Sequence, residues 1–341
     1  MINNPTNKNW LNLTVEETLD PDLKICDPHH HLWEFRDACV AHRYLFDEFL
    51  TDINCGHNVI STVFVEGGSM YRATGPNEMK PVGETEYANG VAAKSASGLY
   101  GKARIAAGIV GAADLTLGDA VKPVLDAHII SGGGRFRGIR HQLNWDTSKL
   151  IPNGRTAQTE FTSQGTTFRE GFAALSHYGL SFEAWCYHPQ IPQLIELARA
   201  FPDTLIILNH FGGPLGVGPY ADKQDEYFPA WKEAVSELAT CSNVVAKLGG
   251  LNLEINGFGW HRNERPPSSK ELMEKTRRFY EHTIDQFGVK RCMFESNFPP
   301  DMVSCSYNVL WNSFKRLTAN YSASEKADLF HDTANRTYRL D

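Results

Sequence analysis

Asp27-Pro28-His29-His30-His31-Leu32-Trp33 places three consecutive histidines directly after a short apolar run, Leu23 to Cys26. If Lys24–Asp27 forms a β-strand, residues two apart project to the same side of it. His29 and His31 can then direct two imidazoles at one point, which is the geometry of a metal site. A polar turn at the end of a strand is the alternative explanation of this cluster.

Short β-branched or apolar runs alternate with longer amphipathic stretches along the rest of the chain. Together with the first run they predict eight strands, at Lys24–Asp27, Val59–Val65, Ile105–Val110, Gly138–His141, Ser181–Tyr187, Leu205–Asn209, Val244–Leu248 and Cys292–Glu295. The amphipathic stretches predict helices at Glu84–Gly98, Leu117–Ala127, Phe168–His177, Gln190–Phe201, Tyr227–Thr240, Ser269–Phe287, Tyr307–Ala319 and Ser324–Tyr338. Such alternation predicts parallel strands joined by crossover helices, and eight units predict an α/β fold, the (β/α)8 TIM barrel.

An open doubly wound sheet is the main alternative fold. It needs about five or six strands and usually a glycine-rich phosphate turn after the first strand. Histidines follow the first strand here, and Gly132-Gly133-Gly134 precedes a predicted strand instead of linking a strand to a helix. We therefore interpret the three glycines as a connector and favour the barrel.

Three long loops are predicted on the C-terminal face of the barrel, where active sites of this fold form. Gly67–Gly83 and Trp145–Gly165 follow predicted strands and are rich in Gly, Pro, Thr and Asn. Leu253–Pro267 is a third excursion on the same face. We expect these loops to act as lids.

Composition limits the class of protein. The chain has 341 residues, 42% of them hydrophobic, and a net charge of −7. We predict an N-terminal extension over residues 1–22 and one barrel over residues 23–341. No basic stripe points to nucleic acid, and no apolar run approaches the ~20 residues of a membrane span. The first 22 residues lack the apolar core of a signal peptide, so we expect a cytoplasmic protein whose seven scattered cysteines are free thiols.

Polar side chains recur at the predicted strand ends. In a barrel the ends of different strands converge on one pocket. Each residue alone also has a structural explanation, such as a buried histidine with its hydrogen bonds satisfied or a lysine paired with a carboxylate. The set comprises His29, His31, Glu66, Arg140, His141, Tyr187, His188, His210, Lys247, Glu295 and Asn297.

Chemistry assigns expected roles within this set. Neutral imidazoles from His29, His31 and His188 suit Zn²⁺ or a similar cation, with one position left open. His210 is a candidate general acid or base. The fork of Arg140 suits a carboxylate, which implies an anionic or oxygen-rich substrate. We expect Arg140, His141, Tyr187 and Glu66 to bind that substrate.

The order of motifs resembles the amidohydrolase-related branch of the amidohydrolase superfamily, TIM-barrel hydrolases that include lactonases of sugar acids and of 2-pyrone-4,6-dicarboxylate. The resemblance covers Lys24 to Arg339 and implies that His29 and His31 bind metal where metal is present, that His188 adds a ligand and that His210 is catalytic. It is based on Asp27 to Trp33, Gly138-Ile139-Arg140-His141, Tyr187-His188-Pro189, Asn209-His210-Phe211-Gly212-Gly213-Pro214, Lys247-Leu248-Gly249-Gly250-Leu251 and Met293 to Pro299.

The last strand departs from the family pattern. The family ends it in Gly-Ser/Thr-Asp-x-Pro, whereas this chain has Glu295-Ser296-Asn297-Phe298-Pro299. The amide of Asn297 cannot take up a proton as a base. Either Glu295, Glu66 or Asp301 supplies the carboxylate, or the reaction needs none there. Strand alternation makes Glu295 the nearest substitute, and a buried partner for Lys247 or Arg140 is its alternative role.

The first functional hypothesis is metal-assisted hydrolysis of a lactone. Metal, or Arg140 with Lys247, would polarise the carbonyl, His210 or a glutamate would activate water, and Asn297 would donate to the oxyanion. Metal-independent catalysis is an alternative, because several lactonases of this branch work without metal. The second hypothesis is non-oxidative decarboxylation of a hydroxyaryl or unsaturated acid, and the third is an inactive binding barrel. A small-molecule substrate and a homodimer are the expected partners.

Overall fold

The computed structural model describes residues 8–36, 41–156 and 159–340. Its single sheet has eight parallel strands in the order of the chain. Backbone hydrogen bonds from Asn297 N to His29 O (2.9 Å) and from His31 N to Phe298 O (2.8 Å) join the ends of the last and first strands. The (β/α)8 barrel is thus confirmed and the open sheet is wrong. The strands are β1 (Lys24–His30), β2 (Asn58–Val65), β3 (Arg104–Ala112), β4 (Phe136–Arg140), β5 (Ser181–Ala184), β6 (Ile206–Leu208), β7 (Val244–Leu248) and β8 (Cys292–Phe294).

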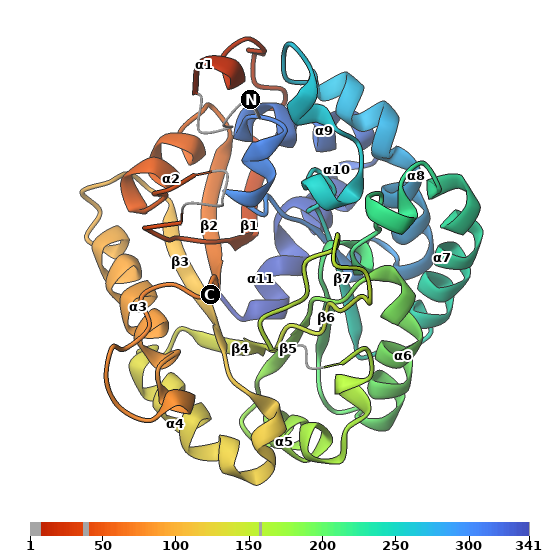
Figure 1. Cartoon of the computed structure of the whole chain (residues 1–341). Helices are drawn as coiled ribbons and strands as arrows, with labels where there is room; N and C mark the ends of the chain where they lie inside the picture. The colour runs from red at the N-terminus through yellow and green to blue at the C-terminus, as the bar shows by residue number, and fades with distance from the viewer. Residues whose placement is uncertain (1–7, 37–40, 157–158, 341) are drawn as a thin grey trace.

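Helices surround the strands on the outside of the barrel (Figure 1). The longest, α8, begins at Ser269 because Ser268 and Glu271 form a reciprocal capping box at its N-terminus. The segment predicted as one helix from Leu117 starts instead as a 3₁₀ turn, Leu115–Val121, which contains Gly118 in a non-helical conformation. The α-helices are α1 (Lys8–Leu11), α2 (Phe46–Ile53), α3 (Val82–Ala96), α4 (Lys122–Ser131), α5 (Thr166–His177), α6 (Ile191–Ala200), α7 (Gln224–Ala239), α8 (Ser269–Phe287), α9 (Tyr307–Leu317), α10 (Ala323–Ala327) and α11 (Thr333–Tyr338).

The barrel interior contains two different layers. Apolar side chains from the strands, among them Val63, Ile207 and Met293, pack with Tyr338 and Leu340 of the C-terminal segment. Polar and charged side chains occupy the opposite layer, toward the carboxyl ends of the strands. The apolar layer makes a rigid support for the charged one.

The segment before β1 is held against α9. Asn312 accepts a hydrogen bond from Leu19 N (2.9 Å), and Lys315 Nζ donates to the carbonyl oxygens of Leu19 (2.7 Å) and Asp20 (2.9 Å). In the described part of the chain no helix is both long and apolar enough to cross a bilayer.

His128 on α4 gives the fold a testable pH dependence. Its Nε2 donates to Ala112 O (3.0 Å) and its Nδ1 accepts from Thr85 (2.8 Å), so the buried ring is neutral. Burial lowers the pKa of His128 from 6.5 to about 4. Because the folded pKa lies below the unfolded one, its contribution to stability is complete above pH 6.5 and is lost as the pH falls toward 4.

We therefore expect His128→Gln to remove part of the acid sensitivity of folding. The unfolding free energies of wild type and variant should converge on acidification by up to about 1.4 kcal/mol per pH unit between pH 6.5 and 4. Urea denaturation at a series of pH values measures this difference. Buried carboxyl groups with raised pKa values change stability with pH in the opposite direction. They are present in both proteins, so their contributions cancel in the difference. Parallel pH profiles would contradict the prediction.

Candidate active site

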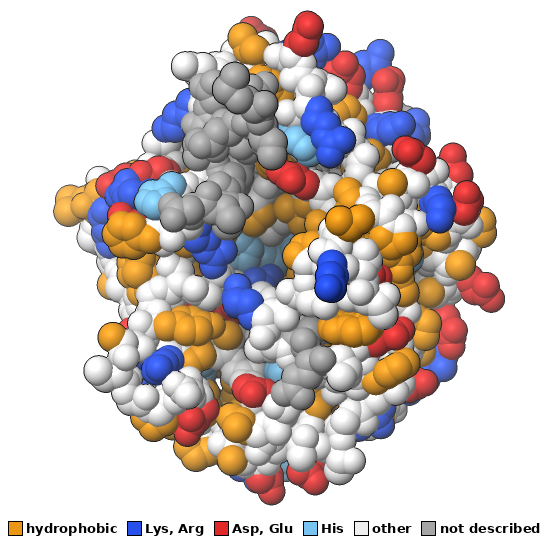
Figure 2. Space-filling view, viewed as in Figure 1, with side chains coloured by type: hydrophobic (Ala, Val, Ile, Leu, Met, Phe, Trp, Pro, Cys, Tyr) orange, Lys and Arg blue, Asp and Glu red, His pale blue; other side chains and the backbone are white. Residues whose placement is uncertain are grey.

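A cavity of about 360 Å³ opens at the carboxyl ends of the strands. Figure 2 shows this face hollowed near its centre, with basic side chains and histidine in the hollow. All three predicted lid loops contribute to its wall. The lining residues are His31, Trp33, Arg36, Gly67, Arg140, Gln142, Asn144, Pro152, Asn153, Gly154, Arg155, Trp185, Tyr187, His210, Leu253, Glu254, Ile255, Asn297, Pro300 and Val303.

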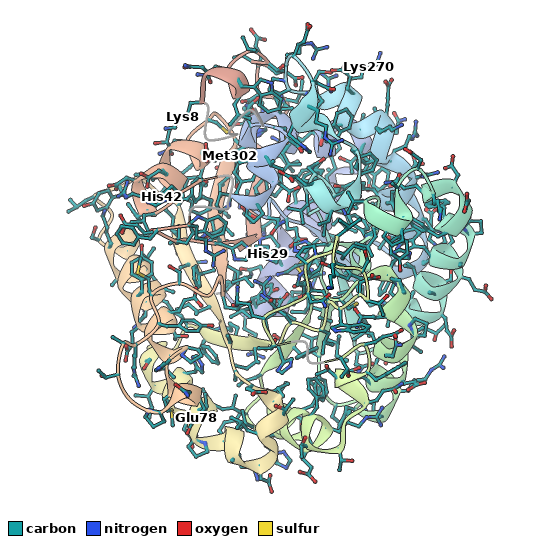
Figure 3. The ribbon with its side chains drawn as sticks, viewed as in Figure 1. Lys8, His29, His42, Glu78, Lys270 and Met302 are labelled. Atoms are coloured by element: carbon teal, nitrogen blue, oxygen red, sulfur yellow. The ribbon has the colours of Figure 1, made fainter. Side chains whose placement is uncertain are left out.

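The three consecutive histidines have different environments. His29 lies at the centre of the barrel (Figure 3), and its Nε2 is 3.2 Å from Nε2 of His31. His30 points to the other side, where its ring stacks on Phe49 with centroids 4.0 Å apart and Nε2 contacts Thr62 Oγ1 at 2.9 Å. Burial lowers the pKa of His30 to about 3, so this residue is a neutral part of the core. The alternation expected of a strand is therefore present.

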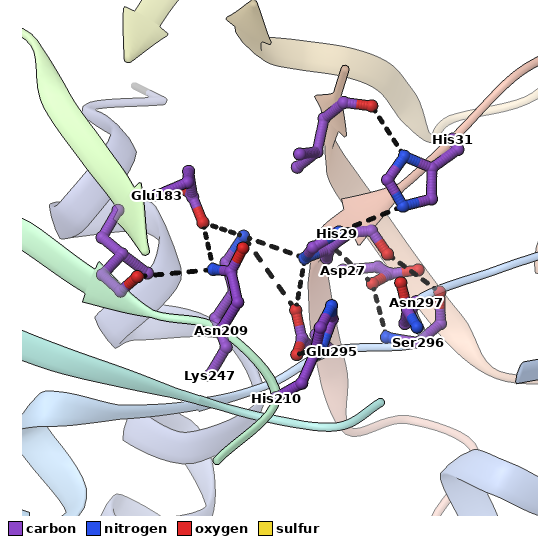
Figure 4. Close-up of polar contacts among 12 residues, drawn as sticks. Asp27, His29, His31, Glu183, Asn209, His210, Lys247, Glu295, Ser296 and Asn297 are labelled. Carbon is purple, nitrogen blue, oxygen red and sulfur yellow. Dashed lines mark hydrogen bonds and ion pairs between the residues drawn. The ribbon is translucent and has the colours of Figure 1, made fainter. Parts of the chain in front are cut away.

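His210 and Glu295 form a buried pair. Nδ1 of His210 is 2.7 Å from Oε1 of Glu295, and Oε2 of the same carboxylate is 2.7 Å from Nδ1 of His29 (Figure 4). Glu295 is fully buried and does not line the cavity, whereas His210 does. An ionised carboxylate only accepts hydrogen bonds, so Nδ1 of His210 carries the proton and Nε2 is left with a lone pair. The glutamate thus orients the imidazole of His210, and its own carboxylate lies behind the cavity wall.

The backbone around His210 is strained. His210 and Phe211 both have positive φ, 51° and 59°. Side chains other than glycine rarely adopt this conformation, and it costs of order 1–3 kcal/mol per residue. Such strain is common at functional sites, where the surrounding structure enforces it.

Lys247 connects two carboxylates inside the barrel. Its Nζ lies 3.0 Å from Glu183 Oε2, 4.0 Å from Glu295 Oε2 and 3.3 Å from His29 Nδ1. Glu183 also accepts hydrogen bonds from Asn209 and from Tyr338, which belongs to the C-terminal helix. Lys247 does not line the cavity. It supplies fixed positive charge beneath the histidines.

Glu66 is shared by two arginines. Arg140 Nε donates to Oε1 of Glu66 (2.7 Å), and Arg155, on a lid loop, pairs with Oε2. Burial raises the pKa of Glu66, but Arg140 and Arg155 outweigh it and hold the pKa below its usual value. Nη1 of Arg140 lies 3.3 Å from Nε2 of His29. Arg140 lines the cavity, and Glu66 holds it from behind.

Asn297 lines the cavity where the family has an aspartate. Its Nδ2 donates to Oδ2 of Asp301 (2.6 Å), and Oδ1 of Asp301 accepts from Asn252 N (3.0 Å). Burial raises the pKa of Asp301 to about 7. One amide N–H of Asn297 remains for a ligand.

Two of the predicted site residues lie apart from this group. Nδ1 of His188 accepts from Leu215 N (3.3 Å), and its ring stacks on Tyr227 with centroids 4.1 Å apart. The structure therefore does not bring His188 together with His29 and His31, because β5 ends at Ala184 and His188 begins a separate 3₁₀ turn, His188–Gln190. His141 is buried and does not line the cavity. Its Nδ1 accepts from Leu115 N (3.2 Å) and its Nε2 contacts Thr156 O (3.1 Å), so its ring bridges two backbone segments. Tyr187 does line it, and its hydroxyl binds Pro152 O.

Trp33, Arg36, Arg155 and Trp185 also line the cavity, and none of them was among the predicted site residues. The ring of Trp185 meets that of His210 edge-on, with centroids 4.8 Å apart. Trp185 stands two residues before Tyr187, so alternation in the predicted strand could have placed both on one side. Arg155 comes from the middle of a long loop, where no periodicity reports direction.

The residues present fit a divalent cation. His31 donates Nδ1–H to Val65 O (2.8 Å), so its Nε2 presents a lone pair toward His29. Burial and nearby cations hold the pKa of His29 and His31 well below the usual range, in the neutral form that binds metal. Oε2 of Glu295 is buried with Nδ1 of His29 at 2.7 Å as its nearest described polar neighbour. His29, His210 and Glu295 each offer a ligand atom within 4.8 Å of the others. Nitrogen and carboxylate donors suit zinc.

A family model described as Amidohydrolase matches residues 26–340. The chain belongs to the amidohydrolase family. The uncharacterized protein y4mH of Sinorhizobium fredii is 34% identical, over 94% of this chain and 99% of its own length. L-fucono-1,5-lactonase of Burkholderia multivorans is 27% identical, over 70% and 73% of the two chains. A solved amidohydrolase of Burkholderia multivorans with bound zinc shares the fold, with a TM-score of 0.71, 23% identity and coverage of 93% and 99%. This amidohydrolase is an enzyme of a hydrolase family.

Gly250 leaves the room that His210 needs in this amidohydrolase. A Cβ at Gly250 would lie 2.1 Å from Nδ1 and 2.4 Å from Cγ of His210, and the backbone has φ of +71°. We expect Gly250→Ala to displace the imidazole and to lower kcat about 100-fold or more. Gly288→Ala is the matched control, because Gly288 has φ of +75° and nothing within 4 Å of the added Cβ. An equal loss of kcat in the two variants would show that backbone strain, and not the position of His210, causes the loss.

Proposed function

We propose that this amidohydrolase hydrolyses a lactone, a cyclic ester of an anionic or oxygen-rich small molecule. The main support is the pair of Glu295 and His210, because a carboxylate that fixes the tautomer of a histidine at a cavity wall is the arrangement of a general base. Arginines around the same cavity suit a substrate rich in oxygen. The lactonase name of the Burkholderia multivorans relative supports the same reaction class.

In the proposed reaction Nε2 of His210 removes a proton from water as the water oxygen attacks the lactone carbonyl carbon. The remaining N–H of Asn297 and the unused N–H groups of Arg140 donate to the carbonyl oxygen as it gains negative charge. The bond between the carbonyl carbon and the ring oxygen then breaks. His210 returns its proton to that oxygen, and the product is a hydroxy acid.

We propose that His29 and His31 hold a zinc ion, with His210 and Glu295 beside it and without His188. A zinc ion there would act as a Lewis acid on the carbonyl. Lys247 and Arg140 already place positive charge 3.3 Å from the two ring nitrogens of His29. Metal-independent hydrolysis is therefore the alternative, and zinc content decides between them. Elemental analysis should find about one zinc per chain in wild type and much less in His31→Gln.

The reaction test uses two lactones, L-fucono-1,5-lactone and 2-pyrone-4,6-dicarboxylate. Ring opening releases one acid equivalent, which a pH-stat records without a chromophore. Turnover of either lactone that is lost in His210→Asn supports the proposal. Release of CO₂ from 2,6-dihydroxybenzoate, without turnover of either lactone, would instead favour decarboxylation. Ligand-induced stabilisation with neither reaction would favour a binding barrel.

Cytoplasmic location, a homodimer and the separate N-terminal extension stay predictions.

A further inference from the structure

The cavity contains more positive than negative charge. Three arginines line it, Arg36, Arg140 and Arg155, and Glu254 is its acidic lining residue at an exposed position. Glu66 lies behind the wall and neutralises Arg140 and Arg155 together. A single carboxylate therefore serves two guanidinium groups. The third guanidinium, that of Arg36, is not part of this arrangement.

Arg36 makes no ion pair with any residue that the structure describes. Its guanidinium lies over the ring of Trp33, 4.3 Å from the centroid. Trp33 is 2% exposed, and its Nε1 donates to Ala41 O (2.7 Å), so the ring is fixed. Stacking on a fixed ring holds the plane of a guanidinium and leaves the N–H groups at its edge free. Arg36 is thus a pre-oriented donor without an acidic partner among the described residues.

We propose that Arg36, stacked on Trp33 in the cavity wall, binds a carboxylate of the substrate, and that the enzyme acts on a lactone that bears a free acid group. A guanidinium fork matches both oxygens of a carboxylate. Arg140 and Asn297 are assigned to the ester carbonyl, so Arg36 determines specificity at a second point of the substrate. The inference depends on the proposed function only for the lactone ring, because the anion site can be tested without turnover.

Calorimetric titration with citrate tests the anion site, and the trimethyl ester of citrate provides the same skeleton without charge. We expect wild type to bind citrate and not the ester, and Arg36→Met to weaken citrate binding about 10-fold or more. Arg43→Met is the matched control, because Arg43 pairs with Glu34 and Glu48 and does not line the cavity. Arg36→Lys keeps the charge without the fork and should bind citrate with intermediate affinity, which covers the case of a poorly folded Arg36→Met.

Several outcomes would overturn the inference. They are equal citrate affinity in wild type and Arg36→Met, equal binding of citrate and its ester, or no citrate binding to wild type at millimolar concentration. Failure of the proposed function looks different. Citrate binding that depends on Arg36, together with no ring opening of either lactone, would remove the lactonase and leave the anion site in place.

Discussion

The variant His210→Asn is expected to lose lactone turnover by about 100- to 10,000-fold, which is the usual effect of removing a general base. The asparagine amide can still donate to Oε1 of Glu295 from near the position of Nδ1, which lies 2.7 Å away in wild type. The amide cannot take up a proton from water. The change therefore removes the chemistry and keeps the buried carboxylate paired, so the unfolding free energy should change by only about 1–2 kcal/mol. Steady-state kinetics with the two lactones measures the loss.

His177→Asn is the control for this variant. His177 is exposed at the end of α5, and its Nδ1 contacts only Ala173 O (3.2 Å) among the described residues. Its substitution should leave kcat and KM unchanged. Near-wild-type activity of His210→Asn would show that another group activates water, and Asp301, whose pKa is raised to about 7 by burial, would be the next carboxylate to test.

Much of the barrel could be predicted because its signals are local. β7 and α8 have the bounds that the sequence predicts, Val244–Leu248 and Ser269–Phe287. The first is a continuous apolar run except for Lys247, and the second has a capping box at its start. The helix α2, Phe46–Ile53, was not predicted, because it is short and its N-cap is Leu45, a residue without a capping side chain.

The site was harder to predict than the fold, because its pairs are distant in sequence. His210 and Glu295 are 85 residues apart, and Lys247 contacts His29 across 218 residues. The strand ends could be placed at one face of the barrel by topology alone. Which side chain meets which depends on where each strand stops, and β5 stops four residues before His188. Neither the pairing of Arg155 with Glu66 nor the stacking of Arg36 leaves any periodic signal in the sequence.

The segment that follows β8 differs from the family pattern at two positions that the structure connects. Glu295 stands where the family pattern has glycine, and Asn297 stands where it has aspartate. A carboxylate is thus present one pleat deeper, behind His210, while an amide faces the cavity. Gly249 accommodates the change, because a Cβ there would lie 2.5 Å from Cγ of Glu295. In the proposed reaction the base is therefore His210, oriented by the buried Glu295, while an amide occupies the position that is aspartate in the family pattern.

This interpretation predicts that Glu295→Gln lowers kcat about 100-fold or more, although the side chain keeps its shape. Lys247, 4.0 Å from Oε2, favours the amide oxygen on its own side, so the NH₂ group turns toward His210. Nδ1 of His210 must then accept a hydrogen bond, which moves its proton to Nε2 and removes the lone pair that takes the proton from water. KM and citrate affinity should remain, because Glu295 does not line the cavity.

The split between kcat and KM separates orientation of the base from a merely structural role of Glu295. A structural role would lower the unfolding free energy and weaken substrate binding along with turnover, because the strand ends that shape the cavity would move. Glu233→Gln, on the exposed face of α7, controls for the loss of one negative charge. Full activity of Glu295→Gln would mean that His210 needs no carboxylate to hold its tautomer. Glu295 would then be only a partner of Lys247, and the two residue differences after β8 would have no effect on catalysis.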